Sequence, residues 1–323
     1  MRNIIFYHYC VNGDCFTSRI LVDHFIKNVK NVVFYYTAFR SLASHCLDLG
    51  ITNNNFNVIR LPGYNDEDFP EHDKHDNFFI YNNDLYINPW IGKFKSKFCI
   101  WCLDNYIDYY NSIISNINKN VNEFNIPQIN NTITPYVPFN YKYYNCEFLN
   151  DYIVNLKKQF KKIILFYNNF VTTYILFNNL DYTKLINIIS EYYPDFIFIT
   201  FKNTDLNKPN VIDISTIYIN NNFILPNAYG IEFTYLNTLC DKVFFSPSGL
   251  SQLGFYNENM IKNKYAILYC KCNLITPMCI CDECENENLC IEKYHFYCKK
   301  IWIDTDNLIY QIEHFINLPY TYG

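Results

Sequence analysis

The sequence predicts an α/β protein made of two consecutive, doubly wound domains. Strand-like apolar segments alternate with amphipathic helical segments along most of the 323 residues. Several of these strands are short and almost wholly apolar, which is typical of parallel strands covered by helices on both faces. The alternation stops around residues 132–145, where two prolines fall in a stretch without a clear period, and then begins again.

The first domain is expected to span residues 1–135. Strands over 3–9 and 31–39 enclose a helix over 15–29, whose apolar residues repeat with helical spacing. A shorter helix over 40–50, closed by Gly50, completes a β-α-β-α opening of Rossmann type. An exposed acidic loop over 63–76, a hairpin turning at Asn82–Asn83 and a helix over 103–124 are expected to follow.

The second domain is expected to span residues 136–323, with a cysteine-rich insertion at 270–298. Its strands are predicted at 161–169, 195–200, 210–214, 242–246, 264–270 and 299–304. Its helices are predicted at 150–160, 182–193 and 230–241, and a last one carries Leu308, Ile309, Ile312, Phe315 and Ile316 on one side. Short apolar strands alternating with helices again predict a Rossmann-like sheet.

Composition excludes some function classes. The net charge of −5 argues against a general nucleic-acid binder, which needs a basic face. The N-terminus lacks the pattern of a signal peptide, and no apolar stretch is long enough for a transmembrane helix. We therefore expect a cytoplasmic protein with reduced cysteines. Asn-rich stretches such as "ITNNNFN" and "NINKNVNEFN" are interpreted as padding from a biased composition.

The stretch "VFFSPSGLSQLGF" (243–255) is the first candidate site. A strand that ends at Phe245 would place Ser246, Ser248, Gly249 and Ser251 at the carboxyl end of the sheet. Backbone N–H groups of a following helix, with the serine hydroxyls, would suit a phosphate there. An ordinary βα turn with a serine cap explains the same residues, and this alternative stays open.

The longer segment "LNTLCDKVFFSPSGLSQL" resembles the late donor-domain segment of GT-B glycosyltransferases of the heptosyltransferase-like and fucosyltransferase-like kind. The segments "KKIILFYNN" and "FIFITF" resemble the first two strands of that domain. The resemblance implies a GT-B-like fold and a nucleotide-sugar donor whose diphosphate contacts the serine-glycine turn. Asn168, Asn169 and Thr200 would then lie at strand ends that face the cleft.

The first βα turn carries His8, Gly13, Asp14 and Arg19. The resemblance implies that Asp14, in a "G-D" pair, is the base that deprotonates an acceptor hydroxyl in an inverting transfer, with His8 and Arg19 nearby. Arg19 is suited to pair with a carboxylate or a phosphate. Asp14 is equally suited to cap the helix, and one "G-D" pair does not support a nicotinamide cofactor.

Seven of the fourteen cysteines crowd into residues 270–298. Zinc knuckles explain such crowding, and the candidate ligands are Cys279, Cys281, Cys284, Cys290, His295 and Cys298. Loose reduced thiols are the alternative, because the spacing matches no standard finger. The zinc would brace a loop, and catalysis would need no cofactor.

Two further groups are weaker candidates. His72 and His75, in "PEHDKHD", have a spacing that suits a metal but sit in an acidic, solvated run. Trp90 and Trp101 suit either a sugar-binding groove or core packing. The favoured function is a glycosyltransferase acting on a nucleotide-sugar and a glycan or other hydroxyl acceptor. A non-catalytic α/β scaffold with a zinc-braced surface, or another nucleotide-binding α/β enzyme such as an epimerase, is the alternative.

Overall fold

The computed structural model describes residues 3–8, 12–38, 48–49, 56–58, 77–89, 103–130, 139–143, 146–168, 181–201, 204–214, 229–245, 261–262, 264–269, 298–302 and 306–322. The chain divides into two compact units. Of the described residues, those up to Asn140 belong to unit 1 and those from Tyr141 onward belong to unit 2. The expected boundary at 135/136 falls among residues 131–138, outside the described ones.

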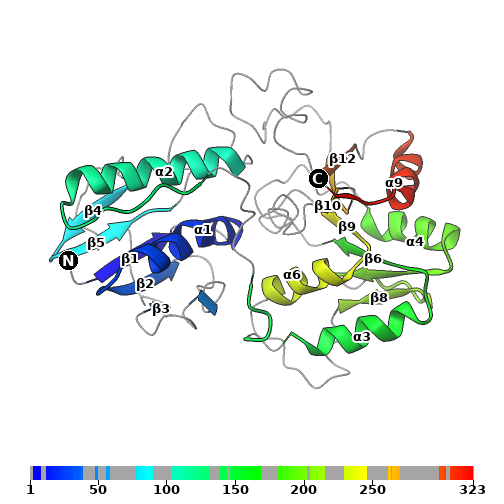
Figure 1. Cartoon of the computed structure of the whole chain (residues 1–323). Coiled ribbons are helices and arrows are strands. Elements are labelled where there is room, and N and C mark those ends of the chain that lie inside the picture. The colour runs from blue at the N-terminus through cyan, green and yellow to red at the C-terminus, as the bar shows by residue number, and fades with distance from the viewer. Residues whose placement is uncertain are drawn as a thin grey trace. The chain divides into compact units, whose positions relative to one another are not determined.

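Unit 1 is built on a five-stranded sheet with the order β3-β2-β1-β5-β4 (Figure 1). Its elements are β1 (Asn3–His8), α1 (Asn12–Asn28), β2 (Val33–Ala38), β3 (Phe56–Val58), β4 (Phe78–Tyr81), β5 (Asp84–Ile87) and α2 (Leu103–Asn120). Every neighbouring pair is parallel except β4 with β5. That hairpin turns at Asn82 and Asn83, both with positive φ, as the sequence predicts.

Two expectations for unit 1 were wrong. Helix α1 begins at Asn12 instead of Cys15, so Gly13 and Asp14 belong to its first turn and not to a turn before it. The "ITNNNFN" stretch is not padding throughout, because Phe56 and Asn57 belong to β3, which pairs with β2. A predicted helix over 40–50 has only Asp48 and Leu49 among the described residues.

The Asn-rich segment that surrounds the end of α2 also has a structural role. Asn118 donates to the Ile126 carbonyl and accepts from the Ile126 N–H, and Asn111 does the same with Ile129. These paired bonds satisfy backbone groups that have no strand partner. Asparagine is used here because its amide offers both a donor and an acceptor. Interpreting "NINKNVNEFN" as padding was therefore wrong for Asn118.

Unit 2 is built on a six-stranded parallel sheet with the order β12-β11-β9-β6-β7-β8. Its strands are β6 (Lys162–Tyr167), β7 (Phe196–Thr200), β8 (Val211–Asp213), β9 (Lys242–Phe245), β11 (Tyr265–Tyr269) and β12 (Cys298–Trp302), and its helices are α3 (Phe148–Lys157), α4 (Tyr182–Tyr192), α6 (Tyr229–Leu239) and α9 (Leu308–Asn317). A separate antiparallel pair joins β10 (Ile261–Lys262) to β13 (Thr321–Tyr322), which the sequence did not predict.

Helices cover both faces of this sheet. On one face, α4 and α9 pack on alternate residues of the strands, with Phe166, Phe244 and Phe315 at the centre of a buried cluster. The Phe166 and Phe244 rings stack at 4.5 Å, and Phe315 meets Phe244 edge-on. Helices α3 and α6 contact each other and lie apart from α4 and α9 (Figure 1). The short, fully buried strands therefore follow from burial on both faces, as the sequence predicts.

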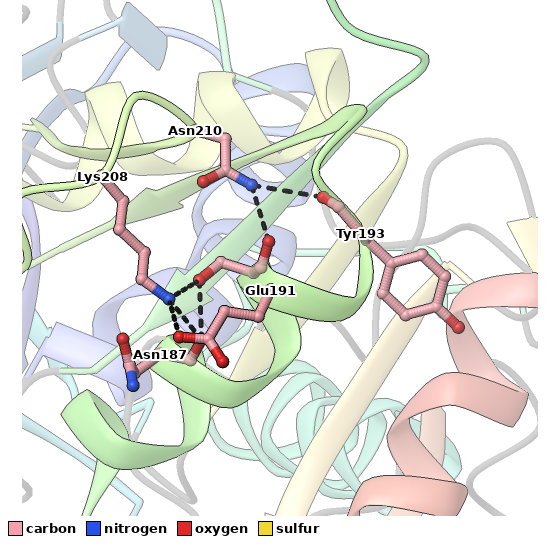
Figure 2. A network of polar contacts seen from close by, with 6 residues as sticks. Asn187, Glu191, Tyr193, Lys208 and Asn210 are labelled. Atoms are coloured by element: carbon pink, nitrogen blue, oxygen red, sulfur yellow. Dashed lines mark hydrogen bonds and ion pairs between the residues drawn. The ribbon is translucent and has the colours of Figure 1, made fainter.

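Residues of the loop that joins β7 to β8 form hydrogen bonds with the C-terminal end of α4 (Figure 2). Lys208 Nζ donates to the Asn187 carbonyl at 2.7 Å, and Asn210 Nδ2 donates to the carbonyls of Ser190 and Tyr193. The last carbonyls of a helix have no partner within the helix, and a lysine there also complements the helix dipole. At the other end, the Asp181 carboxylate accepts from the Lys184 N–H.

Candidate functional site

The strand order of unit 2 defines where a ligand is expected. Numbered along the unit, the sheet reads 6-5-4-1-2-3, which is the Rossmann order, and its direction of winding reverses between β6 and β9. Open parallel sheets bind ligands outside the carboxyl ends of the strands at such a switch point. Strand β9 ends at Phe245, so the residue that follows it is Ser246. Strand β9, which the candidate segment follows in the sequence, therefore ends at the switch point. Ser246, Ser248, Gly249 and Ser251 themselves lie outside the described residues.

Asn168 follows β6 at the same edge. Its Oδ1 accepts from the Phe201 N–H at 2.8 Å, and the Phe166 carbonyl accepts from that N–H at 3.1 Å. The Phe201 ring lies 4.8 Å from the Tyr167 ring. Asn168 thus connects the carboxyl ends of β6 and β7 at this edge of the sheet. Asn169 lies outside the described residues.

Thr200 is the last residue of β7, and it is buried. Its hydroxyl donates to the Ile212 carbonyl of β8 over 3.4 Å, a long hydrogen bond. Its backbone neighbour across the sheet is Asp213, the last residue of β8. The structure therefore gives Thr200 a role in holding β8 against β7.

Unit 1 has its own switch point, between β1 and β5. His8 is the last residue of β1, and Asp14 is the third residue of α1. Strand β1 therefore leads, within a few residues, into the positive end of a helix dipole. The side chains of His8 and Asp14 lie outside the described ones, so the base role of Asp14 stays a prediction.

Arg19 does have a carboxylate partner, as its position in the sequence suggested, and that partner is Asp48. The guanidinium donates to Asp48 Oδ1 at 2.7 Å and to Oδ2 at 2.9 Å, and both side chains are buried. Asp48 Oδ2 also accepts from the Asn140 N–H, and the Phe139 ring lies 3.9 Å from the guanidinium carbon. This geometry gives Arg19 a structural role: with Asp48, it holds Phe139 and Asn140 in place.

Sequence reasoning missed a polar group beside β1. Asn88 directly follows β5 and is fully buried, and its carbonyl accepts from the Tyr109 hydroxyl at 3.2 Å. Burial raises the pKa of Tyr109, and the neighbouring Tyr7 raises it further, so the phenol stays a neutral donor. The signal that could have found it is an Asn placed at the end of the second strand of the predicted hairpin.

The metal candidates cannot be placed as a group. Cys298 is the first residue of β12, whereas Cys279, Cys281, Cys284, Cys290 and His295 lie outside the described residues, as do His72, His75, Trp90 and Trp101. Within the described part of the chain, no three His, Cys, Asp or Glu residues are grouped to hold a metal. Two described cysteines, Cys146 and Cys240, are buried and are not joined in a disulfide. The same part of the chain contains no helix both long and apolar enough to cross a bilayer.

The fold and the edge described above define an α/β protein with parallel sheets, whose second unit has the strand order of nucleotide-binding domains. No family model matches the chain, and no curated protein matches it. Similar solved structures include a glycosyl transferase of family 9 from Veillonella parvula, at 9% identity and a TM-score of 0.47, covering 97% of this chain and 88% of that one.

A second similar structure is the ADP-heptose LPS heptosyltransferase II of E. coli, at 10% identity and a TM-score of 0.46, covering 98% of both chains. A UDP-N-acetylglucosamine 2-epimerase is similar at 12% identity and a TM-score of 0.37, covering 97% of this chain and 87% of that one. The first two structures are named as glycosyltransferases, which is also the class that the sequence resembles. The function proposed below rests on this chain's own strand order and residues.

Proposed function

We propose that this protein is a glycosyltransferase that moves a sugar from a nucleotide-sugar to a hydroxyl acceptor. The observation that carries the proposal is the strand order of unit 2. Strand β9 is one of the two strands at the switch point of this Rossmann order, and the "SPSG" segment follows it in the sequence. In the proposal, a diphosphate binds there to backbone N–H groups and hydroxyls of that segment. An ordinary βα turn could occupy any strand end, whereas this one follows one of the two central strands.

In the proposed reaction, the Asp14 carboxylate takes the proton of the acceptor hydroxyl. The hydroxyl oxygen bonds to the anomeric carbon as the bond from that carbon to the diphosphate oxygen breaks. The nucleoside diphosphate leaves with the electron pair, and the turn at 246–251 stabilises its charge. Direct displacement of this kind inverts the anomeric configuration.

The first experiment is a thermal shift assay with a panel of nucleoside diphosphates. A ligand that binds only the folded chain at a hundred times its Kd stabilises it by about 2.7 kcal/mol, which gives a shift of several degrees. The double variant Ser248→Ala/Ser251→Ala should lose that shift, while the control Ser115→Ala, on α2, should keep it. If no nucleotide stabilises the protein, the proposal fails.

The second experiment separates binding from catalysis. Asp14→Asn should abolish transfer and leave the nucleotide-induced shift intact, because the donor would bind to the other unit. The matched control is Asp23→Asn, in the same helix, which should leave turnover unchanged. Turnover by Asp14→Asn equal to that of the wild type would remove Asp14 as the base without removing the nucleotide site.

A further inference from the structure

Lysines gather at the edge of unit 2 where its strands begin and its helices end, which we call the amino edge. Its described side chains contain seven lysines and three acidic residues: Lys157, Lys158, Lys161, Lys162, Lys208, Lys242 and Lys264 against Glu191, Asp195 and Asp241. The whole chain, in contrast, has a net charge of −5. Positive charge is therefore concentrated at one edge of an otherwise acidic protein.

Several of these lysines lie close enough to act on one another. Burial and the charge of Lys162 together lower the pKa of Lys242 to about 8, against the opposite effect of Asp241. The pKa of Lys264, also about 8, is lowered by burial and by Lys157. Asp241 is therefore shared among several cations, and the amino edge keeps an excess of positive charge.

Lys208 binds the last turn of α4, as described above, and the other six lysines divide into two groups with different roles. Lys242 and Lys264 are buried and Lys162 is partly buried. Lys162, Lys242 and Lys264 donate to the carbonyls of Ile316, Leu318 and Thr238, respectively, at the ends of α9 and α6. These three hold helix ends in place. Lys157, Lys158 and Lys161, at the end of α3 and just before β6, are exposed, so they are the ones that an external partner can reach.

Tyrosines lie along the same edge. Tyr192 ends α4 and is 63% exposed, three residues before Asp195, whose carbonyl accepts from the Lys161 N–H. Tyr320 is 38% exposed; its hydroxyl donates to the Asp241 carbonyl, and its ring lies 4.9 Å from Lys242 Nζ. Exposed tyrosine with exposed lysine is the combination found where proteins meet the headgroup region of a bilayer.

We propose that the amino edge of unit 2 docks onto a membrane surface that contains anionic lipids. Each lysine near such a surface strengthens binding about fivefold, and Tyr192 adds an amphipathic ring that can enter the headgroup layer. The acidic remainder of the chain favours an arrangement in which only this edge approaches the anions. A nucleic acid is the less favoured partner, because general nucleic-acid binders are basic overall. The proposal is independent of the glycosyltransferase proposal.

The test is co-sedimentation of the full chain with vesicles of phosphatidylcholine alone or of phosphatidylcholine and phosphatidylglycerol in equal parts. We expect binding only to the anionic vesicles, and loss of that binding at 0.5 M salt, where charges are screened within a few ångströms. The variant Lys157→Glu/Lys158→Glu/Lys161→Glu should bind at least a hundredfold more weakly. The control Lys27→Glu/Lys30→Glu/Lys119→Glu has the same net charge and exposed positions in unit 1, and it should bind far better than the first variant.

Circular dichroism first shows whether each triple variant is folded. If either variant is unfolded, both are made again with glutamine in place of glutamate. Equal weakening by the two triple variants would overturn the proposal, because binding would then follow net charge alone. So would the absence of binding to anionic vesicles. Binding of a 20-nucleotide RNA through the same lysines, without binding to vesicles, would replace the membrane with a nucleic acid and would equally overturn it.

Discussion

The buried ion pair between Arg19 and Asp48 supports a quantitative prediction. Asp48→Asn removes the negative charge but keeps the size of the side chain, so it takes the Asp48 counter-charge from the guanidinium in a site where both side chains are almost fully buried. In the wild type, Asp48 Oδ1 accepts from Arg19, and Oδ2 accepts from both Arg19 and Asn140. The substituted side chain would replace one of these acceptor oxygens with an NH₂ group, which would then face an N–H donor. Breaking one side of a buried pair costs about 3–5 kcal/mol. We expect a loss in the lower part of that range, because asparagine keeps one acceptor.

The matched control is Asp23→Asn, which breaks an ion pair with Lys27 on the surface of the same unit. That pair is solvated, since the Lys27 side chain is 68% exposed, so its loss should cost at most about 0.5 kcal/mol. The assay is urea unfolding followed by circular dichroism and fitted with a separate transition for each unit. A loss below about 1 kcal/mol for Asp48→Asn, or equal losses for the two variants, would refute a buried and essential pair. The double variant Arg19→Met/Asp48→Leu should recover part of the stability, because it leaves neither charge unpaired.

Three further predictions concern unit 2 and the cysteines. Lys208→Met removes the lysine that binds the last turn of α4 and should lower the stability of unit 2 by about 1–2 kcal/mol in the same urea assay, whereas an unchanged midpoint would contradict the role of this lysine. Lys242 and Lys264 have a pKa of about 8 in the folded chain, against the ordinary lysine value of 10.5. The unfolded chain therefore binds more protons between these two values, and stability should rise with pH from about 8. Burial raises the pKa of Cys240 from 9.0 to about 12, so this thiol makes the folded chain less stable as the pH rises above 9. The increase in stability due to the lysines should therefore be measured between pH 8 and 9, and it should be smaller in Lys242→Met. Elemental analysis of the purified protein should find roughly one zinc per chain if the cluster at 270–298 binds metal, and a content near zero would remove the zinc hypothesis.

Periodicity predicted the described strands of the central sheets well, because burial on two faces demands runs such as "KIILFY" and "FIFIT". It failed where the stabilising contacts are not local. Strand β3 holds three residues, and it forms because β2 offers a parallel neighbour. Helix α1 begins three residues before the predicted position, because "NGD" is equally typical of a turn and of a first helical turn.

The sequence predicted only that the serine-glycine segment follows a strand. That this strand, β9, lies at a switch point depends on the order of six strands, which no local pattern contains. The partner of Arg19 is another case, because Asp48 lies 29 residues away and carries no mark of pairing. The buried lysines were also missed, since a lysine that begins a strand looks in the sequence like a solvated one.

The central pairing of β6 with β9 has a consequence for how the protein is made. Ile163 and Asp241 exchange hydrogen bonds across this pair, although 78 residues separate them. On the ribosome, β6, β7 and β8 emerge first, and one long side of β6 has no neighbour until β9 follows. Unpaired strand edges promote association between chains. We therefore expect this interval of translation to be the period in which the nascent chain depends most on chaperones.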